Sequence, residues 1–223
     1  MVSTAKTTRI LIADDHEMIR AGLRGLLERE HGCEVVGEAA DGWDTVEMAH
    51  RLSPDIVLSD LTMPRLSGVE ATRQMRAHNP LLKVIIVSVH GDSVMVAEAL
   101  RAGVSGYLLK SSAPVELSLA LRAARAGETY LSPRISQVVV AAYLHGVEIP
   151  SDASAYSQLT PKQREVLQLL AEGKSNKEVA CELVISSKTV EAHRAQIMEK
   201  LSIYSLAGLT KYAVREGLTT LDA

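Results

Sequence analysis

The chain has 223 residues, 47% of them hydrophobic, a length that suits one large domain or two ordinary ones. Aromatic residues make up only 3%, with no Phe and one Trp, so the core must be mainly aliphatic, as in α/β and all-α layers. The net charge of −3 is too small to decide anything globally, so any nucleic-acid binding must come from a placed face and not from bulk charge. No apolar run approaches the roughly 18 residues of a membrane span.

The N-terminal sequence and the two cysteines indicate a cellular compartment. MVSTAKTTRIL lacks the basic patch, apolar stretch and small-residue cleavage site of a signal peptide. Cys33 and Cys181 are far apart and neither has a CxxC partner, so we predict reduced, packed thiols, with a disulfide or a zinc site as the alternative. We therefore expect a cytoplasmic protein with no membrane partner.

The first 127 residues alternate between two hydrophobic periods. Short apolar runs predict five strands, at 9–13, 33–39, 55–59, 83–88 and 106–109. An amphipathic helical stretch follows each strand, and Gly103 and Gly127 stand where two of these helices should end. This alternation predicts the α/β class, with a doubly wound, five-stranded parallel sheet.

The remaining sequence changes character twice. Ser132-Pro133 can start one more helix, and VEIPSDASAYSQ then has the composition of a linker. Four helical segments follow, at about 161–172, 175–183, 187–201 and 205–216. We predict three parts: a first domain over residues 1–127, a linker with a helix over 128–158, and a small all-α domain over 159–223.

Charged and hydroxyl side chains follow the strands of the predicted sheet. Ligands of open parallel sheets gather at the carboxyl ends of the strands. The residues at those ends are Asp14, Asp15, Asp60, Ser88 and Lys110. Clustered carboxylates repel one another unless a cation compensates, and Mg²⁺ prefers such oxygen ligands. The sequence therefore predicts a magnesium site at this edge.

This set of residues also suits phosphoryl transfer. A carboxylate can act as the nucleophile and form an aspartyl phosphate, while Lys110 and the metal neutralise charge on the phosphoryl oxygens. Ser88 could bind one of those oxygens. Taken singly, Asp14 could instead cap a helix, Asp60 could be a turn residue and Lys110 a solvated side chain. We expect His16 and His90 at the rim of the pocket rather than as zinc ligands.

The separated residues Asp14-Asp15, Asp60, Met63-Pro64, Gly68, Ser88 and Lys110 resemble the receiver domain of bacterial two-component response regulators over about residues 8–127. The resemblance implies a flavodoxin-like fold in which Asp60 accepts a phosphoryl group from a sensor histidine kinase. It also implies that Mg²⁺ is held by Asp15, by Asp60 and by the backbone carbonyl of Thr62, with Asp14 contributing indirectly.

The same resemblance implies a conformational switch. Lys110 would pair with the phosphoryl group, Ser88 would be the switch hydroxyl, and Tyr107 would turn inward when Ser88 moves. The alternative for Tyr107 is a half-buried tyrosine on a strand. Val89 departs from the smaller residue that many receivers have there, and we hypothesise that it slows hydrolysis of the phosphoryl group.

The C-terminal sequence predicts a helix-turn-helix. Thr160-Pro161 is a good helix start, and Ser175 with Glu178 can form a capping box on the next helix. Ile185, Ser186 and Ser187 would form the turn, with Ser186 or Ser187 capping the last long helix. A second helix of this kind enters the major groove of DNA.

The motifs LTPxxxxVL, GKSNKEVA and TVExHxxxIxxKL are similar to the DNA-binding domain of the LuxR/FixJ type, across about residues 157–220. Together with the first domain, the chain resembles a full-length NarL/FixJ-family regulator. The resemblance implies phosphate contacts from Lys177, Ser187, Lys188, Thr189, Arg194 and Lys200, and base readout by Glu191, Ala192 and Ala195. The alternative for any one of these residues is a solvated helix face.

Dimerisation is expected because one tail has few cations and should bind DNA weakly. Pairing two tails on adjacent half-sites raises their affinity through effective concentration. In this family the last helix is a dimer surface, which implies roles for Leu206, Leu209, Tyr212 and Ala213. Part of the same face must also cover the domain's own core.

We therefore expect a phosphorylation-dependent transcription regulator that binds double-stranded DNA as a homodimer. It would be no enzyme beyond self-phosphorylation and self-dephosphorylation at Asp60. In its unphosphorylated form we expect the receiver to cover part of the recognition helix. The alternatives are a protein that works through receiver contacts alone, such as a phosphate sink, and a DNA-binding protein that ignores phosphate.

Overall fold

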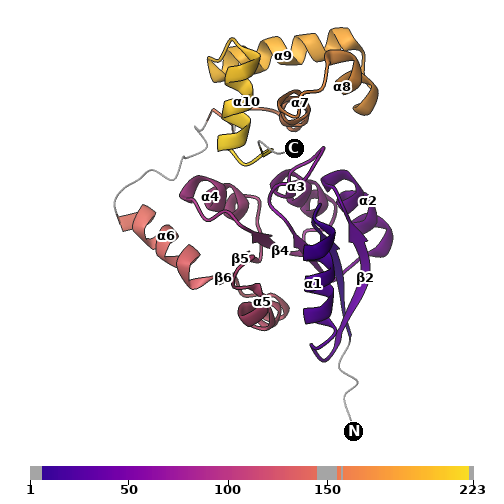
Figure 1. Ribbon diagram of the computed structural model, residues 1–223, viewed down its shortest axis with the longest axis vertical. Coiled ribbons are helices and arrows are strands. Elements are labelled where there is room, and N and C mark those ends of the chain that lie inside the picture. The colour runs from indigo at the N-terminus through magenta and orange to yellow at the C-terminus, as the bar shows by residue number, and fades with distance from the viewer. Residues whose placement is uncertain (1–6, 145–154, 157, 221–223) are drawn as a thin grey trace.

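A computed structural model describes residues 7–144, 155–156 and 158–220 (Figure 1). An α/β domain and a smaller helical domain lie against each other. Residues 145–154, which hold much of the predicted linker, are outside the described residues. The elements of the first domain are β1 Thr8–Ala13, α1 Glu17–Leu27, β2 Cys33–Ala39, α2 Gly42–Leu52, β3 Ile56–Ser59, α3 Gly68–His78, β4 Lys83–Ser88, α4 Ser93–Arg101, β5 Gly106–Leu109, α5 Ala113–Ala126, β6 Tyr130–Leu131 and α6 Pro133–Leu144.

All strand pairs of the first domain are parallel, in the order β2-β1-β3-β4-β5-β6. The doubly wound parallel sheet is thus confirmed, with one strand more than the sequence predicted. Strand β6 has only two residues, which pair with Gly106 and Tyr107. So short a strand has no hydrophobic period, and sequence patterning could not reveal it.

Helices cover both faces of the sheet because successive strand residues point to opposite sides. Ile10, Ile12 and Leu58 pack with α1 and α5 on one face. Leu11 and Val57 pack with α2, α3, α4 and α6 on the other face. With both faces covered, the strands can be continuously apolar, and the open carboxyl edge is where polar residues can gather.

The second domain contains α7 Pro161–Ala171, α8 Asn176–Glu182, α9 Ser187–Leu201 and α10 Leu206–Arg215. Complete capping boxes start α7 and α8, and the Ser186 hydroxyl caps α9 by accepting from the Thr189 N–H. Aliphatic residues of all four helices share one core. Within the described part of the chain, every helix is too short or too polar to traverse a bilayer.

The contact between the domains differs from our expectation. Hydrogen bonds and ion pairs to the first domain come from α7, from Glu172, from Glu182 and from Gly217 after α10. Helix α9 lies on the side of its domain away from the sheet (Figure 1). The predicted covering of the recognition helix is therefore wrong for this conformation.

Gly68, at the start of α3, offers a test of the packing beside strand β3. A Cβ at this position would lie 1.9 Å from the Asp60 carbonyl oxygen. We expect Gly68→Ala to lower the free energy of unfolding by about 2–4 kcal/mol, since the clash is with backbone. Gly25→Ala is the control: nothing lies within 4 Å, and a helical alanine should be neutral or stabilising by up to about 1 kcal/mol. If urea titrations show equal losses of unfolding free energy in Gly68→Ala and Gly25→Ala, the close packing at Gly68 is wrong.

Candidate functional site

Acidic side chains meet at the carboxyl edge of the sheet, as the sequence predicted. Asp14, Asp15 and His16 follow β1, and Asp60 follows β3. One ligand atom from each of the four lies within 4.8 Å of the others. Asp14 and Asp60 are almost fully buried, whereas Asp15 and His16 are exposed. A buried cluster of this kind requires compensation by a positive group.

Lys110 supplies that positive group from the end of β5. Its Nζ lies 2.7 Å from Asp14 Oδ2 and donates to Asp60 Oδ2 at 2.8 Å. Burial alone would lower the pKa of Lys110, but the two carboxylates outweigh burial and raise it. The ammonium group therefore stays charged and ties three strand ends together.

Asp60 has an unusual electrostatic environment. Its pKa is raised to about 6, mainly by burial and to a smaller extent by the charge of Asp14, against the lowering effect of Lys110. The Leu61 N–H donates to Asp60 Oδ1 at 2.7 Å, which leaves Oδ2 paired with Lys110. At neutral pH the carboxylate is mostly ionised, as a nucleophile must be.

The predicted switch residues are adjacent. Ser88 is fully buried, and its Oγ accepts from the His90 N–H at 3.1 Å. Tyr107 is also fully buried, and its hydroxyl donates to the His90 carbonyl at 2.9 Å. The tyrosine is thus inward in this conformation, and the β4–α4 loop connects it to Ser88.

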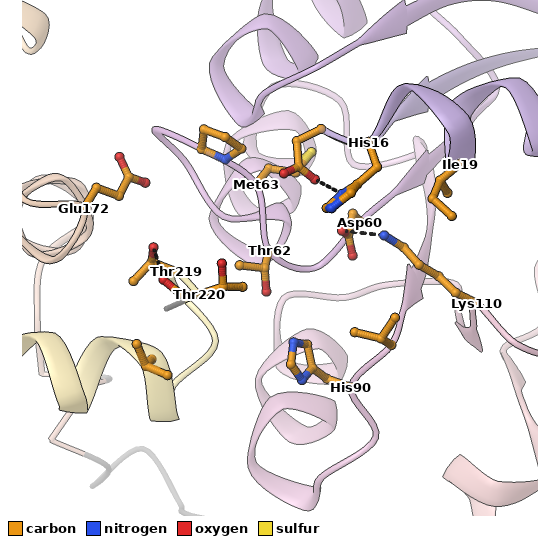
Figure 2. Close-up of a pocket in the computed structure, with 14 residues that line it drawn as sticks. His16, Ile19, Asp60, Thr62, Met63, His90, Lys110, Glu172, Thr219 and Thr220 are labelled. Atoms are coloured by element: carbon orange, nitrogen blue, oxygen red, sulfur yellow. Dashed lines mark hydrogen bonds and ion pairs between the residues drawn. The ribbon is translucent and has the colours of Figure 1, made fainter. Parts of the chain in front are cut away.

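A cavity of about 620 Å³ opens above Asp60 (Figure 2). The residues from the first domain include Asp15, His16, Thr62, Val89 and Lys110. The second domain contributes Glu172, Val214, Thr219 and Thr220 to the same lining. His16 and His90 also line the cavity, and His16 Nδ1 lies 2.8 Å from Asp15 Oδ1.

The donor set fits a hard divalent cation. Three carboxylates converge, and oxygen donors are the ligands that Mg²⁺ prefers. Thr62, the expected carbonyl ligand, lines the cavity beside them. Asp15 is exposed and lies at the open side, where a hydrated ion could enter.

The residues expected to contact DNA are mostly accessible. Exposed side chains among them are Lys177, Lys188, Thr189, Glu191, Ala192 and Ala195; Ser187 and Arg194 are half-buried. Lys200 differs, because its Nζ donates to the Gln158 carbonyl and to Gln163 Oε1, both at 2.8 Å. In this conformation Lys200 stabilises its own domain.

The expected dimer residues fall into two groups. Leu209, Tyr212 and Ala213 are buried in the core of the second domain, so in this conformation they are not a dimer surface. Leu206 is 40% exposed and remains available. The sequence shows that a helix has an apolar face but does not show whether its own domain already covers that face.

Sequence reasoning missed the residues that join the two domains. Gln168 on α7 and Glu172, the C-cap residue of that helix, contact the β3–α3 loop, and Thr219 lines the cavity. They are about 100 to 160 residues from Asp60 along the chain, and no motif relates them to it. Only the docking of the domains brings them together.

Comparisons with known proteins agree with this geometry. Residues 10–122 match the family described as response regulator receiver domain. Residues 157–213 match the bacterial regulatory proteins of the luxR family. The transcriptional regulatory protein LiaR of Bacillus subtilis (strain 168) is 40% identical over 210 residues, covering 94% of this chain and 98% of LiaR.

Solved structures of the response regulator RcsB are similar over nearly the whole chain. One, from Salmonella enterica serovar Typhimurium, is bound to the promoter rprA in the presence of the phosphomimetic BeF₃⁻; its TM-score is 0.62 at 27% identity, covering 93% of this chain and 98% of that one. Another contains two RcsB dimers bound to two parallel DNAs, with a TM-score of 0.58 at 27% identity, covering 95% and 99%.

The raised pKa of Asp60 predicts that the difference in stability between wild type and Asp60→Asn depends on pH. Between pH 3.8 and about 6 the folded state binds a proton that the unfolded state has lost, so this group's contribution to stability decreases as pH rises through that window. In EDTA at pH 7.5, Asp60→Asn should be more stable than wild type by about 2–3 kcal/mol, because a pKa unit corresponds to about 1.4 kcal/mol. Urea titrations should show that this difference in the free energy of unfolding between the variant and wild type shrinks toward pH 4. A difference that stays constant with pH would contradict the raised pKa of Asp60.

Proposed function

This chain belongs to the NarL/FixJ family of two-component response regulators, and we propose that phosphorylation of Asp60 controls its binding to promoter DNA. The receiver would span residues 1–127 and the DNA-binding domain residues 159–223, in a cytoplasmic protein. The observation that carries this proposal is the buried Asp60 carboxylate paired with Lys110 beside two further aspartates, in a chain with an exposed helix α9.

Asp60 would be the phosphoryl acceptor. Its ionised carboxylate forms the new bond to phosphorus while the bond to the donor's leaving group breaks, and the leaving group takes the electron pair. Lys110, already 2.8 Å from Asp60 Oδ2, is placed to pair with the transferred phosphoryl group. Asp15, Asp60 and the Thr62 carbonyl would hold Mg²⁺, which when bound neutralises charge on the phosphoryl oxygens, with Asp14 acting through Lys110. The donor would be a sensor histidine kinase.

Ser88 and Tyr107 would transmit the event. Both contact the main chain of His90, so a Ser88 hydroxyl that turns toward the phosphoryl group gives up its bond to the His90 N–H. The freed loop then repacks the surface between α4 and β5. This is a local change in hydrogen bonding with a wider conformational effect, as in other regulatory switches.

Helix α9 would read DNA in the major groove as one half of a homodimer. Lys177, Lys188 and Arg194 supply phosphate contacts, and Glu191, Ala192 and Ala195 are placed for base readout. RcsB is a relative that binds DNA as a dimer. Of the expected dimer residues, Leu206 is the one that keeps an exposed side chain for this contact.

Acetyl-phosphate labelling tests the proposal. We expect wild-type protein with Mg²⁺ to take up one phosphoryl group, and Asp60→Asn and EDTA-treated protein to take up none, as scored by intact mass. Labelled protein should bind duplexes selected from a random-sequence pool at least about tenfold more tightly than unlabelled protein, a typical coupling.

Glu128→Gln, an exposed change directly after the receiver, should label and bind as wild type does. Labelling without any binding to the pool would favour the phosphate sink. Equal binding by labelled and unlabelled protein would favour a DNA-binding protein that ignores phosphate.

Val89 generates a separate prediction about phosphoryl lifetime. Its side chain is 70% exposed and lines the cavity above Asp60, where it can hinder an attacking water molecule. We expect Val89→Ala to shorten the lifetime by about two- to tenfold, which corresponds to up to about 1.4 kcal/mol of barrier. The measurement is the decay of labelled protein after removal of acetyl phosphate. Equal lifetimes in Val89→Ala and wild type would show that Val89 does not slow hydrolysis.

A further inference from the structure

Two histidines of the first domain lie in contact outside the site around Asp60. His50 is in the last turn of α2 and His78 is in the last turn of α3. The centres of their imidazole rings are 4.3 Å apart, and the ring planes are tilted by 40°. Both side chains are exposed, so burial in the core does not hold them together. The proposed function uses neither residue.

The fold explains why residues of these two helices meet. Helices α2 and α3 lie side by side on one face of the sheet, and each leads into the strand that follows it, β3 or β4 (Figure 1). Their C-terminal ends therefore share the amino edge of the parallel sheet, opposite the carboxyl edge that holds Asp60. Side chains in the last turns of the two helices can reach one another there.

The two helix ends make this edge attractive to a cation. Each helix C-terminus carries about half a negative charge, which favours a basic residue in the last turn. Arg76 on α3 is directed elsewhere, because its Nη1 donates to the Leu82 carbonyl at 3.0 Å and its side chain lies against Gly103. The helix dipoles account for one histidine on each helix. They do not account for the contact between the rings, since two imidazolium ions would repel each other.

A cavity of about 240 Å³ adjoins the histidine pair. Its polar lining consists of His50, Ser53, His78 and Asn79, and the rest of its lining is apolar. The Asn79 side-chain oxygen already accepts from the Leu81 N–H at 3.1 Å. The imidazole nitrogens are the strongest ligands for a transition metal in this lining, and the cavity gives space for the water molecules that such an ion retains.

We propose that His50 and His78 form a two-histidine site for Zn²⁺, with water completing the coordination. Imidazole nitrogen suits Zn²⁺, whereas Mg²⁺ prefers oxygen donors, so this site and the aspartate edge would select different metals. Two nitrogens at about 2.0–2.1 Å from a tetrahedral Zn²⁺ are about 3.3 Å apart, a separation that rings with centres 4.3 Å apart can reach by side-chain rotation. The ion joins the ends of α2 and α3, and its binding does not depend on phosphorylation of Asp60.

Calorimetric titration of the full chain with Zn²⁺, in the presence of excess Mg²⁺, tests the site. We expect His50→Asn and His78→Asn each to raise the Kd for Zn²⁺ about a hundredfold, because the second ligand of a linked pair acts at a high effective concentration. The double variant should lose little more than either single variant, since one ion needs both rings. Both side chains are exposed, so the asparagine variants should fold as wild type does.

Urea titrations provide a second measurement, because an ion held between two helices stabilises the folded state. At a free Zn²⁺ concentration a hundredfold above the wild-type Kd, the unfolding equilibrium constant of wild type should fall about a hundredfold. The same concentration would only equal the Kd of an asparagine variant, so the unfolding constant of that variant should fall only about twofold.

Two other histidines provide controls. His31 is an exposed histidine of the same domain, and His31→Asn should bind Zn²⁺ as wild type does. His16 belongs to the aspartate edge, where its Nδ1 lies 2.8 Å from Asp15 Oδ1, and His16→Asn should also keep the affinity.

Three results would overturn the proposal. The first is the absence of Zn²⁺ binding by wild type. The second is an affinity that is lost in His16→Asn but kept in the His50 and His78 variants, which would place the ion at the aspartate edge. The third is a set of similar small losses in every variant that add in the double variant, because these indicate adventitious binding to single histidines.

Discussion

The ammonium group of Lys110, held between Asp14 and Asp60, is the interaction on which the site depends. Without this partner, two carboxylates that are almost fully buried could not stay side by side at low cost, since an unpaired buried charge is costly. The pairing joins the ends of β1, β3 and β5 and so orients Asp60 toward the cavity. The remaining burial cost is expressed in the raised pKa of Asp60, and it favours any group that brings positive charge to this edge.

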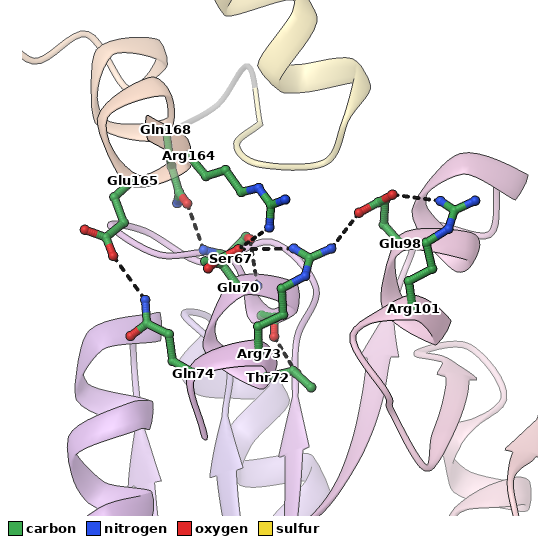
Figure 3. Close-up of polar contacts among 11 residues, drawn as sticks. Ser67, Glu70, Thr72, Arg73, Gln74, Glu98, Arg101, Arg164, Glu165 and Gln168 are labelled. Atoms are coloured by element: carbon green, nitrogen blue, oxygen red, sulfur yellow. Dashed lines mark hydrogen bonds and ion pairs between the residues drawn. The ribbon is translucent and has the colours of Figure 1, made fainter. Parts of the chain in front are cut away.

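The second domain is attached to the same edge, and this has an energetic consequence. Gln168 makes its hydrogen bonds to the loop that begins at Asp60, and Glu70 and Glu98 are buried acids that are satisfied by Arg73 and Arg164 around the interface (Figure 3). Partners of buried charges are costly to remove one at a time, so this interface should open as a unit. The site and the interface share one loop, and any coupling between them would be reciprocal.

The sequence predicted the site better than its surroundings. Residues at strand ends could be placed together because the alternation of strands and helices specifies a parallel sheet, whose carboxyl edge is common to every strand. Nothing comparable specifies where a second domain docks: Gln168 lies within an ordinary amphipathic helix, and the Gln168 contacts depend on surface shape. Leu209, Tyr212 and Ala213 illustrate the same limit, because an apolar helix face is equally consistent with a dimer surface and with the core that the structure reveals.

The exposure of helix α9 changes how control of DNA binding must work. In the docked chain the side chains expected to read bases are already accessible, so docking does not act by covering them. Under the proposed function, a single tail with few cations would bind weakly, and useful affinity would require two tails placed on half-sites about one DNA turn apart. The contacts of Gln168, Arg164 and Arg65 hold each tail against its receiver, and linked binding is lost when geometry forbids both contacts at once. Release of these contacts would therefore matter because it frees two tails to adopt the spacing of the half-sites, rather than because it uncovers a helix.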